Sequence, residues 1–320
     1  MTLLVTGAAG FIGSHLAERL LATTDQHVVG VDNFDPFYAR AVKERNLREL
    51  VKHPRFTFTE LDLRDRARTT AVYAQHAPEA VFHWAARAGV RPSIEDPAGY
   101  VDSNVVVTTT LLQLAAAHAT KRFVFASSSS VYGNNAKVPF GESDATDAPI
   151  SPYAATKKAC ELLCHTFHDL VGLSTACLRL FTVYGPRQRP DLAIHKFARA
   201  ILEDRPVTLY GDGGTSRDYT FIADIVDGIM AADAHLARSP RPIHDVFNLG
   251  NSSPVQLAEL VSLLEEAIGR RARIERAPMQ PGDVLRTYAD ITHARDTFGY
   301  DPKTDLRAGI GHFVRWLREQ

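Results

Sequence analysis

The first 180 residues alternate short apolar runs with longer segments of helical periodicity. The apolar runs are rich in Val, Leu and Phe and hardly alternate with polar residues, which is typical of strands buried on both faces of a sheet. The predicted strands are Leu3–Thr6, His27–Val31, Phe56–Leu61, Ala80–Trp84, Arg122–Ser127 and Ser174–Leu180. The predicted helices between them are Phe11–Leu21, Ala39–Val51, Arg66–His76, Pro97–Ala119 and Pro152–Val171. This order predicts an α/β fold with a doubly wound parallel sheet.

The pattern changes near residue 180. Residues 184–215 are rich in Pro, Gly, Arg and Asp around one helix candidate, Leu192–Glu203, and a second helix is predicted at Val255–Ile268. We therefore predict a Rossmann domain over residues 1–180 and a smaller mixed α/β substrate domain, mainly over 181–320. The two are expected to interleave, because elements between 216 and 250, such as Val246–Leu249, fit the sheet of the first domain.

Charge and composition limit which kinds of partner the protein is expected to bind. The formal net charge is −1 over 320 residues, so no overall field favours nucleic acid or an anionic membrane. No apolar stretch approaches the roughly 20 residues that span a bilayer, and no signal peptide is recognisable. Cys160, Cys164 and Cys177 cannot all pair and have no metal-like spacing, so we expect reduced thiols in a cytoplasmic protein and no metal site.

A glycine turn lies between the first predicted strand and the first helix. Its residues are Gly7-Ala8-Ala9-Gly10-Phe11-Ile12-Gly13. A pyrophosphate needs the free N–H groups at a helix N-terminus, and a Cβ at Gly7 or Gly10 would obstruct the turn or the ligand. Asp32, followed by Asn33, ends the second strand, where a carboxylate accepts ribose hydroxyls and repels a 2′-phosphate. The turn therefore predicts NAD rather than NADP as cofactor.

Asp62 and Leu63 follow the third strand, where the adenine of such a dinucleotide would lie. A second interpretation of Asp62 is structural, because an aspartate just before the helix at Arg66 can cap its N-terminus. The sequence alone leaves both interpretations open.

A second group of polar residues can carry chemistry. Tyr153 and Lys157 are four residues apart at the start of a predicted helix, so they share one face. An ammonium near a phenol favours the phenolate, which makes Tyr153 a candidate general base or acid. The fifth strand ends in Ser127-Ser128-Ser129-Ser130-Val131-Tyr132-Gly133, at the edge where open α/β sheets bind ligands. A hydroxyl at that edge can hydrogen-bond a reacting oxygen.

These motifs, together with His83-Trp84-Ala85-Ala86-Arg87-Ala88-Gly89-Val90, resemble the extended short-chain dehydrogenase/reductase superfamily over nearly the whole chain. The resemblance is closest to nucleotide-sugar 4-epimerases, and among them to UDP-glucuronate 4-epimerases. It implies that Ser128 is the catalytic hydroxyl, Tyr153 the base, and Lys157 the residue that also holds the nicotinamide ribose. It also implies a homodimer through the helices Pro97–Ala119 and Pro152–Val171. Further residues implied at the cofactor are Ala85, Ala86, Asn104 and Val183.

The residues after Ser128 favour one reaction. Dehydratases of the superfamily carry Asp-Glu where Ser129 and Ser130 stand, and UDP-glucuronate decarboxylases keep a glutamate at Ser130. The absence of these acids favours epimerisation at C4 through a transient 4-keto sugar. The alternatives are a UDP-glucose/UDP-galactose 4-epimerase, a decarboxylase, a dTDP-sugar 4,6-dehydratase and a non-catalytic NAD-binding sensor. The last usually lacks the tyrosine or the lysine.

The resemblance also implies which residues bind the sugar nucleotide. Thr182 and Arg189 match positions that face the sugar carboxylate in glucuronate epimerases, and Arg187 is a second candidate. Arg217 and Arg286 can clamp a diphosphate, although each could be a structural ion pair instead. The base would lie along the strand Val207-Thr208-Leu209-Tyr210, which leaves UDP and dTDP unresolved. Further substrate contacts are expected from Val90, Arg91, Ser128, Ser129, Ser130 and Asp283.

Overall fold

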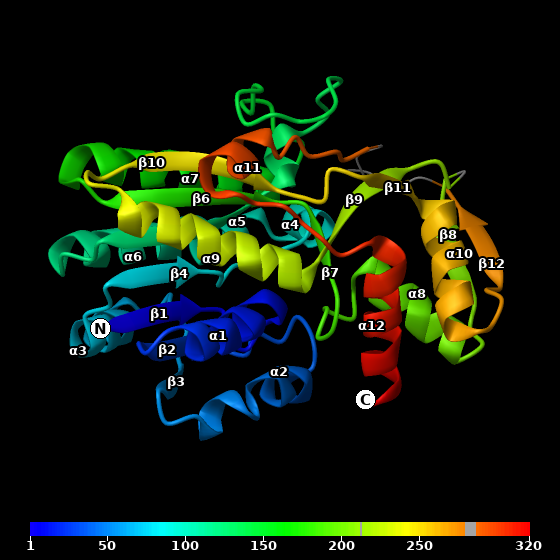
Figure 1. The fold of residues 1–320 in the computed structure, drawn as a ribbon, viewed down its shortest axis with the longest axis horizontal. Coiled ribbons are helices and arrows are strands. Elements are labelled where there is room, and N and C mark those ends of the chain that lie inside the picture. Colours follow the sequence, from blue (N-terminus) through cyan, green and yellow to red (C-terminus); the bar gives the residue numbers. More distant parts are fainter. Residues whose placement is uncertain (212, 279–285) are drawn as a thin grey trace.

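The computed structural model describes residues 1–211, 213–278 and 286–320. Its centre is a seven-stranded sheet of order β10-β6-β5-β4-β1-β2-β3, in which every neighbouring pair is parallel (Figure 1). The strands are β1 (Thr2–Thr6), β2 (His27–Asp32), β3 (Phe56–Glu60), β4 (Ala80–His83), β5 (Arg122–Ser128), β6 (Ser174–Leu180) and β10 (His244–Leu249). The predicted fold class and the six predicted strands are confirmed, with bounds that differ by one residue at most.

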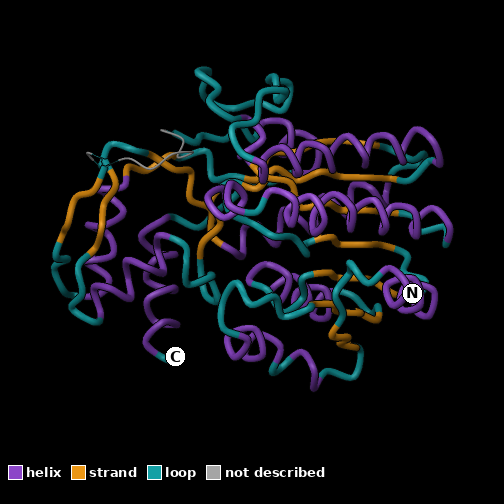
Figure 2. The backbone as a smooth tube through the Cα atoms, turned by 180° about the vertical axis from the view of Figure 1, so that it is seen from behind, coloured by secondary structure: helices purple, strands orange, loops and turns teal. Residues whose placement is uncertain are grey.

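Helices cover both faces of this sheet (Figures 1 and 2). On one face α1 (Phe11–Thr23) packs against α9 (Ile222–Arg238). On the other face lie α3 (Arg66–His76), α6 (Val107–Ala117) and α7 (Pro152–Val171). Successive side chains of β1 point to opposite faces of the sheet. Val5 packs in the core under α1 and α9, and Leu4 packs in the core under α3, α6 and α7. No helix in the described part of the chain has the length and hydropathy to cross a membrane.

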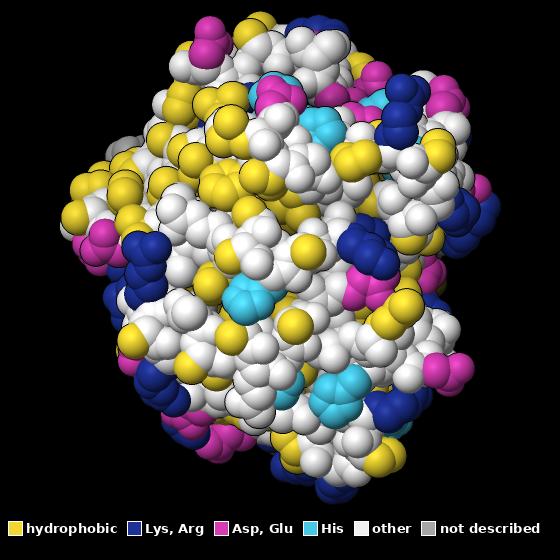
Figure 3. Space-filling model, turned by 90° about the vertical axis from the view of Figure 1, so that its left-hand side faces the viewer, with side chains coloured by type: hydrophobic (Ala, Val, Ile, Leu, Met, Phe, Trp, Pro, Cys, Tyr) yellow, Lys and Arg dark blue, Asp and Glu magenta, His cyan; other side chains and the backbone are white. Residues whose placement is uncertain are grey.

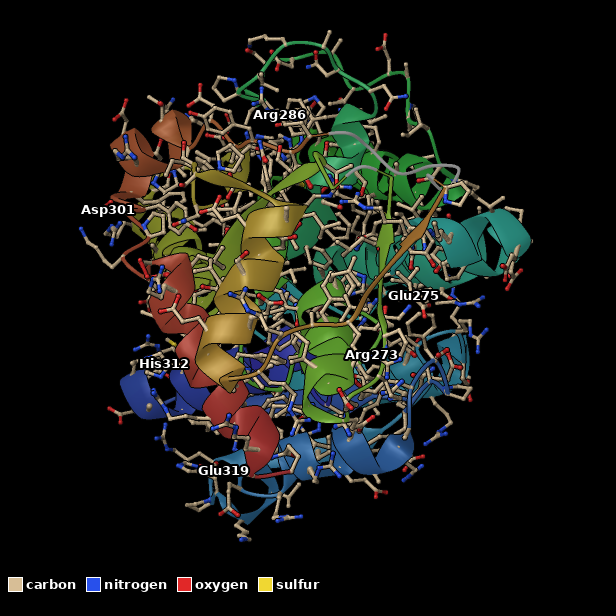
Figure 4. All side chains as sticks on the ribbon, turned by 90° about the vertical axis from the view of Figure 1, so that its right-hand side faces the viewer. Arg273, Glu275, Arg286, Asp301, His312 and Glu319 are labelled. Carbon is tan, nitrogen blue, oxygen red and sulfur yellow. The ribbon has the colours of Figure 1, made fainter. Side chains whose placement is uncertain are left out.

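A smaller unit lies beside the carboxyl ends of the strands (Figure 1). It contains a three-stranded sheet, β11-β9-β7, and a parallel pair, β12-β8. Its strands are β7 (Thr182–Tyr184), β8 (Val207–Tyr210), β9 (Ser216–Phe221), β11 (Pro254–Gln256) and β12 (Ile274–Ala277). Three helices share its core and face the viewer in Figure 4: α8 (Ala193–Leu202), α10 (Leu257–Ile268) and α12 (Leu306–Arg318).

Three predicted helices differ in detail from the structure. The helix predicted over 97–119 is a helical path of α5 (Pro97–Tyr100), a π-helical segment η2 (Val101–Val106) and α6, and it ends at Ala117. The helix predicted over 39–51 ends early and is followed by a 3₁₀ turn, as α2 (Arg40–Leu47) and η1 (Leu50–Lys52). The one predicted from Val255 begins at Leu257, because Pro254–Gln256 pairs with β9 as β11. The spacing of apolar residues in a sequence predicts neither strand pairing of this kind nor a π-helical segment.

The remaining short elements surround the strand ends. They are α4 (Val90–Glu95), the 3₁₀ turn η3 (Ser129–Tyr132) and α11 (Thr292–Phe298). Cys160, Cys164 and Cys177 are buried in the core on the α7 side of the sheet. The three thiols therefore contribute to packing.

Candidate functional site

A cavity of about 460 Å³ opens at the carboxyl ends of the central strands. It is the place where open parallel sheets bind ligands, because the loops that leave neighbouring strands diverge there. Most of the predicted cofactor residues line it: Gly7, Gly10, Phe11, Ile12, Gly13, Asp32, Asn33, Asp62, Leu63, Ala85, Ala86, Tyr153, Lys157 and Val183. Predicted substrate residues on the same lining are Val90, Ser128, Ser129, Ser130, Thr182 and Arg189.

Two glycines of the turn, Gly7 and Gly13, have no room for a side chain. Gly7 has φ +70°, and a Cβ on it would lie 2.8 Å from the backbone nitrogen of Ala85. A Cβ on Gly13 would overlap the carbonyl oxygen of Gly7. No side chain caps α1 at Gly10, so the first N–H groups of the helix remain for a ligand. This cradle fits the pyrophosphate of a dinucleotide.

Asp32 ends β2 and is 7% exposed. Its carboxylate accepts hydrogen bonds from the N–H groups of Ala9, at 3.1 Å, and Phe34, at 2.8 Å. Burial raises the pKa of Asp32, and the ammonium of Lys43, 4.0 Å away, opposes that rise. Ala9, a predicted cofactor residue, is not on the cavity lining. It contributes through its backbone N–H, which positions Asp32. Lys43 was not predicted, since a single lysine in a helix carries no recognisable pattern.

Asp62 does not cap α3. The cap is Asp65, whose side chain accepts from the N–H of Arg68. Asp62 instead binds the guanidinium of Arg64, with Nη2 and Oδ2 2.6 Å apart, and accepts from Asn33 at 3.3 Å. The hydrogen bond from Arg64 lowers the pKa of Asp62 to about 2. The structural interpretation of Asp62 was therefore wrong, and its carboxylate stays ionised beside the cavity.

Tyr153 and Lys157 lie one turn apart at the start of α7, where Ser151 caps the helix and Pro152 is its first residue. The Lys157 ammonium is buried and donates to the carbonyl oxygen of Ala126 at 2.7 Å. It lies 5.9 Å from the centroid of the Tyr153 ring, and Tyr100 packs edge-on against that ring at 6.2 Å. The predicted cation and phenol are thus neighbours in one cavity.

Ser128 is the last residue of β5 and the cap of η3. Its Oγ accepts from the N–H of Ser130 at 3.2 Å and lies 3.1 Å from the Ser130 hydroxyl. A strand end followed by a 3₁₀ turn therefore presents three consecutive hydroxyls, those of Ser128, Ser129 and Ser130, to the cavity that contains Tyr153.

A buried ion pair joins the elements that carry these residues. Both oxygens of Glu161 on α7 accept from Arg179 on β6, each at 2.9 Å, and both side chains are 3% exposed. The hydroxyl of Ser127 on β5 donates to the same carboxylate at 2.5 Å. Burial opposes ionisation, but the hydrogen bonds and charge of Arg179 outweigh it and lower the pKa of Glu161. Sequence reasoning missed this pair, because its two members lie on different elements, α7 and β6, and only their packing brings them together.

Asn104 lies behind the cavity lining rather than on it. Its side chain accepts from the N–H of Arg87 at 2.9 Å and donates to the carbonyl of Arg87 and to Thr156 Oγ1, both at 3.0 Å. It therefore ties the loop after β4 to α7.

The two candidate arginines for the sugar carboxylate are separated by the structure. Arg187 points to α1, where it pairs with Glu18 at 2.7 Å and lies 3.3 Å from the Ser14 hydroxyl. Arg189 lines the cavity, as does Thr182. Its guanidinium pairs with Asp191 and lies 5.0 Å from the centroid of the Phe37 ring.

The predicted nucleotide residues lie in the smaller unit and are not on the lining of this cavity, within the ranges that the structure describes. The Val207 and Leu209 side chains are buried in its core, while the Arg91 guanidinium lies 5.1 Å from the Tyr210 ring centroid. Arg286 forms a β-bridge with Ser216, next to Arg217, and is labelled in Figure 4. Asp283 lies outside the described residues. The described part of the chain contains no group of three or more His, Cys, Asp or Glu side chains suited to a metal ion.

Known proteins share this sequence and architecture. Residues 3–250 match the model of the NAD dependent epimerase/dehydratase family. A UDP-glucuronate 4-epimerase from Thermodesulfobacterium geofontis is 40% identical, over 99% of this chain and 96% of its own length.

Two solved structures are similar over the full chain. A UDP-glucuronic acid 4-epimerase from Bacillus cereus, in complex with UDP-glucuronic acid and NAD, has a TM-score of 0.92 at 36% identity and is covered to 99%. A UDP-glucose 4-epimerase from Thermotoga maritima, with UDP-glucose, has a TM-score of 0.90 at 32% identity and is also covered to 99%. The match of the family model over residues 3–250, together with these relatives, shows that the chain belongs to the NAD-dependent epimerase/dehydratase family.

Proposed function

We propose that the protein is an NAD-dependent UDP-glucuronate 4-epimerase that interconverts UDP-glucuronate and UDP-galacturonate. The observation that carries the proposal is the shared cavity of the Tyr153–Lys157 pair, the serine hydroxyls after β5, and Thr182 and Arg189. Relatives with that named activity match the chain over almost its whole length. The glycine cradle at α1 and the buried Asp32 fit NAD, which supplies the acceptor and then the donor of the C4 hydride.

The residues of the chain have distinct tasks in this reaction. Tyr153 takes the proton of the C4 hydroxyl and returns it to the 4-keto oxygen after the sugar has turned its other face toward the hydride donor. Lys157 stabilises, through its positive charge, the phenolate that is present before the first transfer and again after the second. Ser128 hydrogen-bonds the reacting oxygen and restricts its position. The sugar must turn over between the two proton transfers, so the protein must hold the nucleotide more firmly than the sugar ring.

The same cavity disfavours the competing reactions. Elimination of water from C5 and C6 requires an acid–base pair, but serines follow Ser128, and no carboxylate stands at Ser129 or Ser130. A 4-keto uronate loses CO2 only when the bond from C5 to its carboxylate aligns with the π system of the C4 carbonyl. Arg189 and Thr182 can hold the carboxylate out of that alignment. Arg187 is engaged at α1, which leaves Arg189 as the candidate for the carboxylate. A UDP-glucose 4-epimerase remains the alternative that the Thermotoga maritima structure favours.

Product analysis with purified protein tests the proposal. UDP-glucuronate should yield UDP-galacturonate, whereas UDP-pentose with CO2 would indicate a decarboxylase. Arg189→Ala should reduce kcat/KM for UDP-glucuronate about 10- to 100-fold while UDP-glucose turnover stays near that of the parent. Unchanged uronate kinetics in this variant would contradict the carboxylate role. A Tyr153→Phe protein with undiminished biological activity would instead favour a non-catalytic NAD-binding sensor.

The proposal also assigns a binding task to each part of the chain and a cellular environment to the protein. We assign nucleotide recognition to the smaller unit, mainly residues 181–320, and cofactor binding to residues 1–180 with the returning segment 216–250. The roles of Val207, Leu209, Tyr210, Arg217 and Arg286 belong to this assignment, as does the role of Asp283. If Arg286 contacts the diphosphate, Arg286→Ala should weaken the binding of UDP without a sugar, as measured by titration calorimetry. The three buried free thiols fit a reducing, cytoplasmic environment.

We also propose a homodimer through η2, α6 and α7. Large apolar side chains on these helices are exposed, including Val101 at 45%, Val106 at 50% and Leu162 at 55%. Hydrophobic side chains also gather on the upper part of the face seen in Figure 3. Light scattering should give twice the mass of the chain, and a Leu162→Glu variant should shift it toward the monomer. A monomer mass for the parent would end this part of the proposal.

A further inference from the structure

The guanidinium of Arg189 already has a carboxylate partner within its own loop. Nε donates to Oδ1 of Asp191 at 3.0 Å and Nη2 donates to Oδ2 at 2.7 Å, so one edge of the guanidinium is occupied in bidentate fashion. The side chain of Phe37 lies against the same group, 5.0 Å from Cζ to the ring centroid. Among the described residues, nothing hydrogen-bonds Nη1. A guanidinium has a second edge, so a further carboxylate can bind at the Nη1 end.

We propose that Asp191 is a specificity-determining residue that acts through Arg189, an inference that rests on the proposed function. Asp191 orients the guanidinium by occupying one edge, and it also competes with the sugar carboxylate for the same positive charge. With a neutral hexose bound, Arg189 and Asp191 remain a neutral pair. With a uronate bound, two carboxylates share one cation and repel each other. Asp191 therefore weakens the binding of UDP-glucuronate and leaves that of UDP-glucose nearly unchanged.

The conformation of this loop does not depend on Asp191. Gln188 is buried, and its Nε2 donates to the carbonyl of Val183 at 3.1 Å. The carbonyl of Gln188 accepts from His195 Nδ1 on α8 at 2.7 Å. Arg187 fastens the same loop to Glu18 on α1. Since Asp191 is 37% exposed and hydrogen-bonds only Arg189 among the described side chains, its removal acts on the guanidinium rather than on the loop.

The weakening by Asp191 has a use in an epimerase. Both UDP-glucuronate and UDP-galacturonate carry the carboxylate, and the sugar ring must leave one orientation and take another during each turnover. A guanidinium with a single, unshared carboxylate would hold that group most tightly and slow both the turn and product release. A resident competitor shortens the lifetime of this contact while the guanidinium stays in position.

The test is Asp191→Asn in the NAD-loaded protein, with a Tyr153→Phe background that stops turnover during titration. Asparagine keeps an oxygen acceptor for Arg189 and removes the charge. The Kd for UDP-glucuronate should fall roughly three- to tenfold, as expected for a partly exposed charge, and the Kd for UDP-glucose should stay within about twofold. With the tyrosine restored, kcat for the uronate should fall while kcat for the hexose is unchanged. The charge-retaining Asp191→Glu should keep the parent ratio of the two Kd values.

Glu18→Gln is the matched control, since it removes the carboxylate partner of Arg187 in the same loop without changing Arg189. It should leave both Kd values as in the parent. An Asp191→Asn protein whose uronate Kd is unchanged or higher, or whose two Kd values change by the same factor, would overturn the inference. Arg189→Ala separates this outcome from failure of the proposed function. If that variant binds the uronate as tightly as its parent, the carboxylate does not reach Arg189, and the carboxylate role of Arg189 fails together with this inference, while product analysis still tests the epimerase activity separately.

Discussion

The Glu161–Arg179 pair offers a measurable link between the core and the site. The perturbation is Glu161→Gln, which keeps the shape of the side chain and removes its charge. In the parent, the two carboxylate oxygens accept two hydrogen bonds from Arg179, one from Ser127 and a longer one, at 3.4 Å, from Lys158. In the variant one oxygen becomes an NH₂ group that faces the Arg179 donors, so a guanidinium that is 3% exposed loses its counter-ion.

The expected cost follows from this burial. Breaking one member of a buried ion pair costs about 3–5 kcal/mol, because an uncompensated charge remains inside the protein. The entropy of unfolding is about 2.1 cal/mol/K per residue, which gives about 0.7 kcal/mol/K for 320 residues. The melting temperature should therefore fall by about 4–7 °C. Ser127→Ala removes only one hydrogen bond, worth about 1 kcal/mol, and should lower it by about 1–2 °C.

Calorimetry of the NAD-loaded proteins measures both values, and the epimerase assay gives a second readout. Because Glu161 is one turn after Lys157 on α7, and Ser127 precedes Ser128, loosening this junction should lower kcat more than it changes KM. Tyr73→Phe is the control, since it removes a buried hydrogen bond to Thr120, 2.6 Å long, that lies away from the cavity lining. A Glu161→Gln protein with an unchanged melting temperature would refute the reasoning. Equal kcat losses in Tyr73→Phe would refute the link to the site.

Three further predictions concern the cofactor cradle, the catalytic phenol and pH. Gly13→Ala places a Cβ against the Gly7 carbonyl and should abolish NAD binding in titration calorimetry, whereas retained affinity would contradict the role of the cradle. Tyr153→Phe should lower kcat at least about 100-fold with little change in substrate Kd, and a normal kcat would exclude it as the base. Burial, and secondarily the charge of Lys157, lowers the pKa of His83 to about 3. Unfolded histidine titrates near 6.5, so the unfolded chain binds more protons between these values and stability should fall by up to about 5 kcal/mol as pH drops through this window. His83→Gln should flatten the profile of melting temperature against pH, and an unaltered profile would contradict it.

The sequence predicted the sheet domain well because its signals are local. Each buried strand is a continuous apolar run, and the glycine turn needs only neighbouring residues to be recognised. The same holds for Tyr153 and Lys157, which one helical turn brings together. Topology then does the rest, since parallel strands bring their carboxyl ends to one edge and place Ser128 near Tyr153.

The errors and omissions come from contacts between distant segments. Residues 254–256 form β11 because β9 offers a partner, which overrides the helical pattern that begins there. Asp62 has a capping position by sequence, yet Asp65 is the residue whose geometry suits the cap. The roles of Glu161 and Lys43 follow only from their ion pairs with Arg179 on β6 and Asp32 on β2, which the sequence does not show. The resemblance ranked Arg189 before Arg187 for the sugar carboxylate, but only the position of α1 shows that Arg187 is bound elsewhere, to Glu18.

A deuterium label at C4 of UDP-glucuronate tests the central claim most directly. If hydride leaves C4 and returns to the opposite face within one cavity, the UDP-galacturonate formed in ordinary water retains the deuterium at C4. Mass spectrometry and proton NMR of the separated products measure this. Retention in the inverted sugar is the predicted result. Loss of the label to solvent, or formation of no UDP-galacturonate, would contradict the account.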